Sequence, residues 1–342
     1  SVSIDHATPA SFYAHQPSRN MYYEIGKEIV SSNFDFFGGS NFLKPETCFD
    51  KKAAPSLFPI FEKAGYQILK GKEAYTQHPR KSDKIILMNT DGTATDALKY
   101  AIDQKPSDLK LADITAAAIQ SLEQDNKNGF FLMVEGGKID WACHANDAAT
   151  TIQEVLDFNS AAELAFEYYK KHANETLIVV TADHETGGLG IGNGSSTLKT
   201  KLLANQKLSH TELSNEIGNL RKSKANASWD DLKNLLSIHV GLYNQVQVNA
   251  NDDKLLKEAF QRSFVDHQNE TAKSLYASDD KIAALSIAIL NRMGSIAWAS
   301  NNHSAAYAPV YAIGVGAEQF NQKMDNTDIP KKIALAAKLS LD

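Results

Sequence analysis

Short runs of apolar residues along the chain predict buried β-strands. Four runs stand out, at residues 85–88, 130–134, 177–181 and 310–313. Each run is continuously apolar and does not alternate with polar residues, as expected for strands that are covered on both faces. Between the runs, apolar residues recur at helical spacing. The pattern therefore predicts strands that alternate with helices.

Helical spacing of apolar residues is clearest in four stretches outside the middle of the chain. The predicted helices cover residues 21–31, 109–125, 145–172 and 330–339. Pro330 suits the first turn of the last helix, where a missing N–H costs nothing. The fold class predicted is α/β, with a mostly parallel sheet sandwiched between helices. Catalytic groups are expected at the carboxyl ends of its strands.

Residues 195–292 differ from the rest, because they are polar, helix-prone and poor in strand signals. The stretches "LSHTELSNEIGNL" and "SWDDLKNLLSIHVGLY" each predict a capped amphipathic helix. We predict an α/β domain from residues 1–194 and 293–342, with residues 195–292 as a helical insertion subdomain. The insertion is expected to be peripheral and to carry no chemistry.

Composition narrows the class of protein without naming a function. The chain has 342 residues, is 43% hydrophobic and carries a net charge of −6, which argues against nucleic acid as a specific partner. The sequence has no apolar run of about 18 residues, so no membrane span is expected. Two cysteines, Cys48 and Cys143, allow at most one disulfide and leave the redox compartment open.

Candidate metal ligands gather after three of the predicted strands. They are Glu135, Asp140 and His144, then Asp183 and His184, and lastly His303 just before the run at 310–313. Asp140 and His144 are four residues apart, so a helix would place both on one face. Asp183 and His184 are neighbours, so a loop must bend to aim both at one centre. The glycines at 187 and 188 would permit that bend.

These donors fit known metal preferences. Histidine nitrogen with carboxylate oxygen suits zinc, whereas carboxylate with hydroxyl oxygen suits magnesium. Each fragment alone also fits a surface ion pair or a buried structural histidine. The meeting of three strand ends favours metal binding.

Four motifs in this order resemble the alkaline phosphatases. They are "HATPASFYAH", "VEGGKIDWACH", "VTADHETGG" and "NNHSAAYAPVYAIGVG". The resemblance implies a periplasmic or secreted enzyme that hydrolyses small phosphate monoesters with two zinc ions, one magnesium ion and a phosphoserine mechanism. It also implies a possible homodimer, since family members often pair.

The resemblance assigns roles by position. It gives Asp140, His144 and His303 to the first zinc, Asp183 and His184 to the second, Thr8 and Glu135 to magnesium, and Arg19 to a phosphate clamp. The planar fork of an arginine suits bidentate phosphate contact. His6 and Trp141 stand where some bacterial members carry aspartate and lysine, which is typical of a subgroup, and both are expected near the substrate. Thr186 stands where some members have a second histidine.

Two parts of the family's mechanism have no counterpart in these residues. No serine lies in the family's Asp-Ser-Ala-like context, so the nucleophilic serine is absent from the chain. The second missing part is the family's metal-bridging aspartate, which lies in an Asp-Gly-x-Gly motif upstream of the position of Thr8. The one Asp-Gly pair here, Asp91-Gly92, lies downstream of Thr8, out of family order. We therefore expect the C-terminal part of a longer phosphatase, inactive by itself but with a complete first zinc site.

Two other functions remain open from the sequence. One is another hydrolase of the same superfamily, such as a phosphodiesterase or a phosphonate hydrolase. Arg19, Thr8 and Glu135 favour the monoesterase, since a third metal site is not general in that superfamily. The other is a non-catalytic metal-binding protein. The retention of all seven expected ligands speaks against it.

Overall fold

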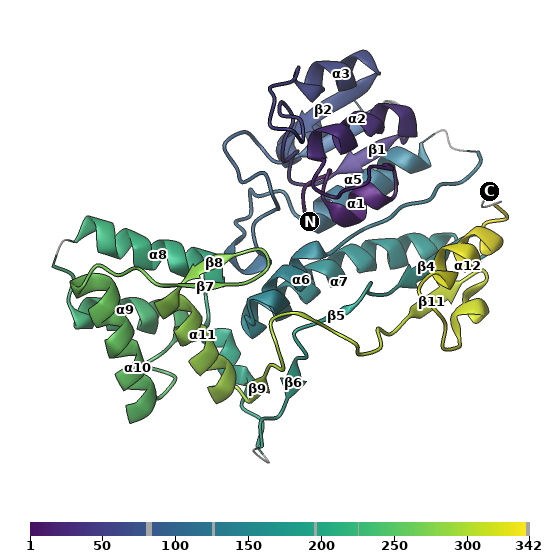
Figure 1. Cartoon of the computed structure of the whole chain (residues 1–342). Helices are drawn as coiled ribbons and strands as arrows, with labels where there is room; N and C mark the ends of the chain where they lie inside the picture. The colour runs from purple at the N-terminus through teal and green to yellow at the C-terminus, as the bar shows by residue number, and fades with distance from the viewer. Residues whose placement is uncertain (80–83, 125–126, 195–196, 225, 340–342) are drawn as a thin grey trace. The chain divides into compact units, whose positions relative to one another are not determined.

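A computed structural model describes residues 1–79, 84–124, 127–194, 197–224 and 226–339 (Figure 1). By their internal contacts, the residues fall into two compact units. The first unit comprises Ser1–Ala142, Ala149–Ala161 and Gln206–Glu216, and the second comprises Cys143–Ala148, Ala162–Asn205 and Ile217–Asp342.

The first unit contains three strands and several helices. They are α1 (Ala7–Ser11), α2 (Tyr22–Ser32), β1 (Phe36–Gly38), α3 (Leu57–Lys63), β2 (Tyr66–Lys70), α4 (Gly71–Gln77), β3 (Lys84–Met88) and α5 (Leu111–Glu123). Helices α6 (Gly137–His144), α7 (Ala148–Lys171) and α8 (His210–Ser223) contribute residues to both units.

The sheet of the first unit is parallel, in the order β1-β3-β2. Side chains of β3 alternate between two apolar clusters. Ile86 and Met88 join the cluster with residues of α2 and α3, whereas Ile85 and Leu87 join the cluster with Ile114 of α5. Because both faces of β3 are covered, the continuous apolar run at 85–88 is explained. The predicted α/β class is confirmed here.

Asp5 is a buried charge in the core of this unit. Its side chain is fully buried, and its Oδ2 accepts a hydrogen bond of 2.9 Å from the Leu43 backbone N–H. Burial raises the pKa of Asp5 to about 6 from an ordinary value of 3.8, although the hydrogen bond from Leu43 acts in the opposite direction. The folded protein therefore binds a proton more tightly at Asp5 than the unfolded chain does.

The substitution Asp5→Asn is expected to change how stability depends on pH. In the wild type, the free energy of unfolding should fall as pH rises from about 4 to about 6, because only the folded state keeps the proton. Asparagine can still accept from Leu43 but has no charge to bury. The variant should therefore gain about 3 kcal/mol relative to the wild type between pH 4 and pH 7. Urea denaturation at both pH values measures this gain, and parallel pH profiles would contradict it.

The second unit is built from short strands and from helices of the middle segment. Its strands are β4 (Leu177–Val180), β5 (Glu185–Thr186), β6 (Gly190–Ile191), β7 (Thr271–Lys273), β8 (Ser278–Asp280), β9 (Ile296–Ala297), β10 (His303–Ser304) and β11 (Tyr311–Gly314). Its helices are α9 (Trp229–Val240), α10 (Ala250–Phe260), α11 (Lys281–Met293) and α12 (Asp328–Ala336).

Strand pairing in the second unit is antiparallel. The pairs are β4 with β11, β5 with β10, β6 with β9, and β7 with β8. The strands predicted at 177–181 and 310–313 are confirmed as β4 and β11. Their antiparallel pairing is a local departure from the mostly parallel sheet that we predicted.

The strand predicted at residues 130–134 is wrong. These residues form no ladder with any described segment. Phe131 is 53% exposed and its ring stacks against Phe12, with the ring centres 6.0 Å apart. The apolar run alone did not identify a strand, because a strand also needs a neighbour whose backbone can pair with it.

The helical predictions hold to within a few residues. Those at 21–31, 109–125, 145–172 and 330–339 correspond to α2, α5, α7 and α12. The stretch 195–292 contains α9, α10, α11 and the β7–β8 hairpin, while its domain status stays a prediction. Asp125 and Ser195, which end and begin two predicted ranges, lie outside the described residues.

Among the described helices, none is long and apolar enough to span a membrane.

Candidate metal centre

Three histidines from distant parts of the sequence meet within the second unit. His144 ends α6, His184 follows β4, and His303 begins β10. The Nε2 atoms of His144 and His303 lie 3.2 Å apart. The rings of His184 and His303 are stacked, with their centres 3.6 Å apart. Imidazole rings that face one another through their nitrogens form a donor set suited to a transition metal.

Short backbone pairing brings the last two histidines together. Strand β5 pairs with β10 so that His303 lies opposite Thr186, two residues after His184. The next residue, Gly187, donates from its N–H to the Asn302 carbonyl at 2.9 Å and accepts at its own carbonyl from Ala299 at 2.9 Å. These bonds fix the two loops against each other, so the histidine positions are set by backbone geometry.

Glycine is required at the bend, as expected from the sequence. Gly187 has φ of +87° and Gly188 has φ of +62°, both in the left-handed region that disfavours side chains. A Cβ on Gly187 would also lie 2.6 Å from a ring carbon of Trp298. The bend therefore needs both the conformational freedom and the small size of glycine.

Gly187→Ala is expected to destabilise the fold and weaken metal binding. Left-handed strain alone costs about 1–3 kcal/mol, and the clash with Trp298 adds to it. Gly129→Ala is the matched control, because Gly129 has φ of +80° with no atom within 4 Å of the added Cβ. Urea midpoints of the two variants separate strain from clash. Equal losses in both would show that the Trp298 contact is unimportant.

The ring orientation of His144 is fixed by a backbone carbonyl. Its Nδ1 lies 2.7 Å from the carbonyl oxygen of Asn301. A carbonyl can only accept, so Nδ1 carries the proton and Nε2 carries the lone pair. Metal-binding histidines are commonly oriented in this way. His144 therefore presents its Nε2 atom toward His303.

The spacing of these nitrogens fits a shared zinc ion. Two nitrogens bound tetrahedrally at 2.0–2.1 Å from one zinc would lie about 3.3 Å apart. The observed separation of 3.2 Å between His144 Nε2 and His303 Nε2 agrees with this value. Two imidazole nitrogens at this distance match part of the donor set of the predicted first zinc.

Asp183 and His184 lie together at the outer side of the second unit. The Asp183 Oδ2 atom is 3.2 Å from His184 Nε2, and the Asp183 side chain is 69% exposed. On the other side of the ring, the Thr186 hydroxyl lies 3.2 Å from His184 Nδ1. Thr186 stands where some family members carry a histidine, and here it contacts the ring that the sequence places on the second zinc.

One aromatic contact to His144 could not be predicted from the sequence. Tyr276 lies in the turn of the β7–β8 hairpin, and its ring meets His144 edge-on with the centres 5.5 Å apart. The hairpin belongs to residues 195–292, which we expected to carry no chemistry. Tyr276 lacks any local pattern that could have marked it, since the contact depends on how the hairpin folds back.

In the first unit, His6 lies among other predicted site residues. Its ring meets Trp141 edge-on, with the centres 5.6 Å apart. Burial and, next, the charge of Arg19 lower the pKa of His6 to about 4, although Asp140 acts in the opposite direction. His6 is therefore neutral at physiological pH. The predicted contacts Arg19 and Trp141 share its surroundings.

Asp140, Thr8 and Glu135 also belong to the first unit. Asp140 lies on α6 one turn before His144, so the helical arrangement that would place both on one face is present. Thr8 lies in α1, and Glu135 precedes α6 by two residues. The pairing of Thr8 with Glu135 at a magnesium ion stays a prediction.

A buried lysine under Trp141 was missed from the sequence. Lys138 is 6% exposed, and its Nζ lies 3.4 Å from the centre of the Tyr100 ring and 5.2 Å from that of Trp141. Burial lowers the pKa of Lys138 to about 8, while Glu154 raises it. Cation–π contacts of this kind hold aromatic rings in place. Lys138 thus supports the ring of Trp141 from within the unit.

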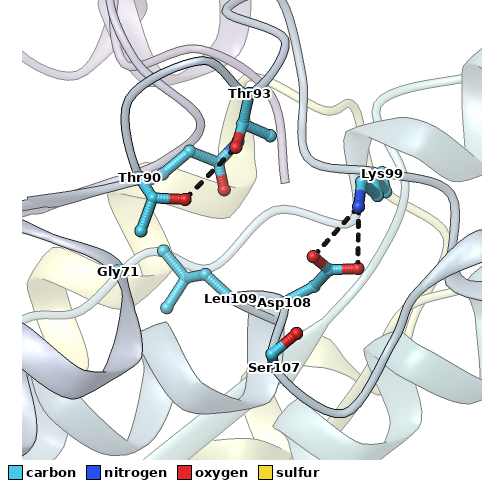
Figure 2. Close-up of a pocket in the computed structure, with 8 residues that line it drawn as sticks. Gly71, Thr90, Thr93, Lys99, Ser107, Asp108 and Leu109 are labelled. Atoms are coloured by element: carbon cyan, nitrogen blue, oxygen red, sulfur yellow. Dashed lines mark hydrogen bonds and ion pairs between the residues drawn. The ribbon is translucent and has the colours of Figure 1, made fainter.

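Asp91 is accounted for outside any metal site. Its carboxylate pairs with Lys70 at 2.7 Å and is 79% exposed. The nearby cavity, between Thr90, Thr93, Lys99 and Asp108, has a volume of about 20 Å³ (Figure 2). That volume suits a single water molecule.

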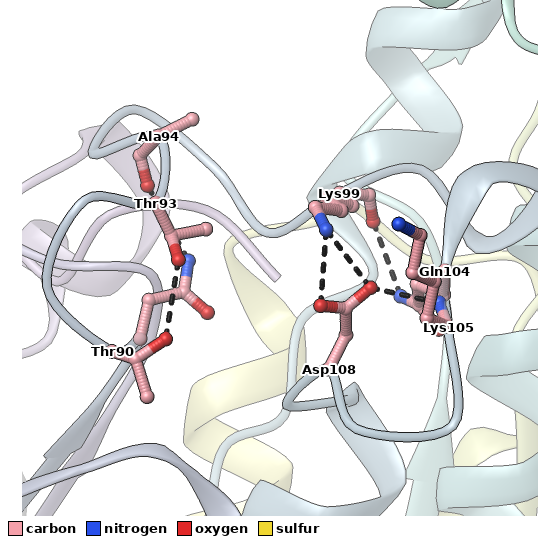
Figure 3. A network of polar contacts seen from close by, with 8 residues as sticks. Thr90, Thr93, Ala94, Lys99, Gln104, Lys105 and Asp108 are labelled. Carbon is pink, nitrogen blue, oxygen red and sulfur yellow. Dashed lines mark hydrogen bonds and ion pairs between the residues drawn. The ribbon is translucent and has the colours of Figure 1, made fainter.

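Charges around this small cavity are already paired. Lys99 donates to both carboxylate oxygens of Asp108, at 3.0 and 3.1 Å, and the Lys105 backbone N–H donates to Asp108 as well (Figure 3). On the other side, the hydroxyls of Thr90 and Thr93 bond to each other. The loop of residues 90–92 therefore has a structural role.

Comparisons with known proteins show the family to which the chain belongs. The sequence profile of the family described as alkaline phosphatase matches residues 36–339. The chain belongs to the alkaline phosphatase family. It is 31% identical to alkaline phosphatase 4 of Bacillus subtilis over 95% of this chain and 63% of that relative. It is also 31% identical to alkaline phosphatase 3 of the same organism, over 99% of this chain and 67% of that relative. The chain thus spans about two thirds of these relatives.

Solved structures of this family share the fold. The crystal structure of the cold-active alkaline phosphatase from Shewanella sp. is 27% identical, with a TM-score of 0.77 over 99% of this chain and 74% of that chain. Thermus thermophilus alkaline phosphatase, 23% identical, has a TM-score of 0.76 over 99% and 70%. A mutant of the TAB5 alkaline phosphatase, 25% identical with a TM-score of 0.60 over 99% and 71%, was solved with magnesium bound.

Proposed function

We propose that this chain carries the metal-binding and phosphate-binding residues of a phosphate monoester hydrolase. The observation that carries the proposal is the histidine cluster, in which His144 Nε2 and His303 Nε2 lie 3.2 Å apart. Membership of the alkaline phosphatase family supports the same reaction.

The proposed ligand sets follow the family pattern. Asp140, His144 and His303 would hold the first zinc, Asp183 and His184 the second, and Thr8 and Glu135 a magnesium ion. The stacking of His184 on His303 supports two neighbouring zinc sites. When bound, such ions supply Lewis-acid stabilisation of charge on phosphoryl oxygens and lower the pKa of water.

The chain's own residues hold and orient the phosphate group. Arg19 has an exposed side chain beside His6, and its fork can donate to two phosphate oxygens at once. The neutral ring of His6 and the indole of Trp141 would form the edge of the phosphate site. Lys138, whose Nζ lies between the rings of Tyr100 and Trp141, holds Trp141 in position.

Residues 1–342 lack a serine in the family's nucleophile context. We therefore propose that this chain, taken alone, binds zinc and phosphate but does not turn over substrate. The phosphoserine step belongs to the family's full mechanism, and this chain contributes metal ligands and the arginine clamp to it.

Binding and turnover measured together test this proposal. Purified chain, loaded with zinc and magnesium, should bind inorganic phosphate in a calorimetric titration and hydrolyse p-nitrophenyl phosphate at no more than a trace rate. Robust hydrolysis would contradict the absent nucleophile, and failure to bind phosphate would contradict the site.

A comparison of two ligands tests the alternative that the chain is another hydrolase of the same superfamily, such as a phosphodiesterase. A monoesterase site should bind phenyl phosphate more tightly than diphenyl phosphate, because the arginine clamp and a third metal favour a doubly charged group. The reverse preference would support a phosphodiesterase.

A further inference from the structure

The β7–β8 hairpin brings an aromatic ring from the middle segment to the histidine cluster of the second unit. Its strands pair antiparallel over Thr271–Lys273 and Ser278–Asp280. The Ser274 N–H closes the turn between them by donating to the Ala277 carbonyl at 2.9 Å. Tyr276 lies in this turn, so its position is set by the register of the two strands.

The base of the hairpin is anchored through Asp280. Its carboxylate forms an ion pair of 2.5 Å with Arg221, and the side chains are only 11% and 18% exposed, respectively. Its other oxygen accepts the Ile282 N–H at the start of α11, at 2.9 Å. Partly buried ion pairs are screened less by salt than exposed ones. These contacts hold the hairpin, and with it Tyr276, in place within the second unit.

The turn of this anchored hairpin contacts the ring of His144. The planes of the Tyr276 and His144 rings meet at 73°, with the ring centres 5.5 Å apart. Aromatic rings prefer this edge-to-face geometry to direct stacking. His144 is 1% exposed, so the contact is made by a buried ring. A contact of this kind favours one tilt of that ring.

The tilt of the His144 ring matters because a single hydrogen bond does not fix it. The bond from Nδ1 to the Asn301 carbonyl decides which nitrogen faces His303, but the ring can still tilt about that bond. Such a tilt would move Nε2 of His144 relative to Nε2 of His303, which lies 3.2 Å away. The Tyr276 ring limits the tilt, because an edge-to-face pair is lost when either ring plane rotates.

We propose that Tyr276 is a positioning residue that holds the His144 ring at the tilt needed for zinc. The proposal rests on the proposed function for the identity of the metal site. Groups that orient metal ligands are commonly as important to metal affinity as this role requires. The middle segment then acts on the metal centre by packing against one of its ligands.

Zinc affinities of two Tyr276 variants test this role. Tyr276→Ala removes the ring and should weaken zinc binding about 10-fold, the lower end of the loss expected when a group that orients a ligand is removed. Tyr276→Phe keeps the ring and should bind zinc as the wild type does. Leu275→Ala is the matched control, because Leu275 is the neighbouring turn residue and is 59% exposed. Competition with a chromogenic chelator gives the affinities.

Proton NMR of the metal-free chain reports on the ring itself. The Nδ1 proton of His144, hydrogen-bonded to the Asn301 carbonyl, should give a resonance that is missing from His144→Ala. The resonance should persist in Tyr276→Phe and weaken or vanish in Tyr276→Ala, because a looser ring lets the proton exchange with water. If Tyr276→Ala lowers the melting temperature severely, Tyr276→Leu replaces it, since leucine keeps an apolar side chain in the turn.

The outcomes separate this proposal from the proposed function. Wild-type zinc affinity in Tyr276→Ala, or an unchanged Nδ1 resonance, would overturn the role of Tyr276. An equal loss of zinc affinity in Tyr276→Phe or in Leu275→Ala would overturn it as well, because neither variant removes the ring. Failure of the wild type to bind zinc would instead contradict the proposed function, while the resonance of the metal-free chain would still report on Tyr276.

Discussion

His144→Ala is expected to lower the zinc affinity of the chain more than about 100-fold. A backbone carbonyl sets the ring orientation of His144, so its Nε2 is preorganised for a metal. Loss of a residue that merely orients a ligand costs about 10–100-fold, and loss of the ligand itself costs more. Competition with a chromogenic chelator gives the affinity. His303→Ala should behave in the same way, since the two nitrogens face each other.

The matched control for this experiment is His239→Ala. His239 lies in the last turn of α9, outside the cluster, so its loss should leave zinc affinity unchanged. Melting in the presence of EDTA shows whether the variants remain folded without metal. Wild-type zinc affinity in a folded His144→Ala variant would show that the cluster is not the metal site.

Arg19→Lys is expected to weaken inorganic phosphate binding by at least about 10-fold. A charge-assisted hydrogen bond contributes about 1.5–3 kcal/mol, and lysine keeps the charge but loses the planar pair of donors. Zinc affinity should not change, because Arg19 is not among the expected ligands. Calorimetric titration of phosphate into the zinc-loaded variant measures the loss.

Arg262→Lys controls for the chemistry of the substitution. Arg262 is half-exposed and pairs with Glu270 at 3.0 Å in the middle segment. Phosphate affinity should be the same in this variant as in the wild type. Equal phosphate affinity in Arg19→Lys and the wild type would remove Arg19 from the phosphate site.

Local sequence patterns predicted the strands that are covered on both faces and the helices with a regular apolar spacing. The run at 85–88 is apolar because both faces of β3 are covered, and the helix predicted at 145–172 is α7. The run at 130–134 has the same composition, but no described strand pairs with it. Hydrophobicity reports burial, whereas pairing depends on a distant partner.

The part of the candidate site that depends on residue type could be predicted from the sequence. The histidines of the motifs, and the glycines that permit a bend, were visible in the sequence, and the structure brings His144, His184 and His303 together. Tyr276 and Lys138 were not visible, because a tyrosine in a turn and a lysine in a first helical turn are ordinary. Their roles arise from tertiary packing alone.

X-ray absorption at the zinc edge of the loaded chain tests the central claim most directly. Zinc held by His144 and His303 should show nitrogen and oxygen neighbours near 2.0–2.1 Å, with the scattering pattern of imidazole rings. His144→Ala should lose part of that imidazole scattering. A dominant sulfur shell near 2.3 Å, from Cys143 or Cys48, or a spectrum unchanged in His144→Ala, would contradict the account.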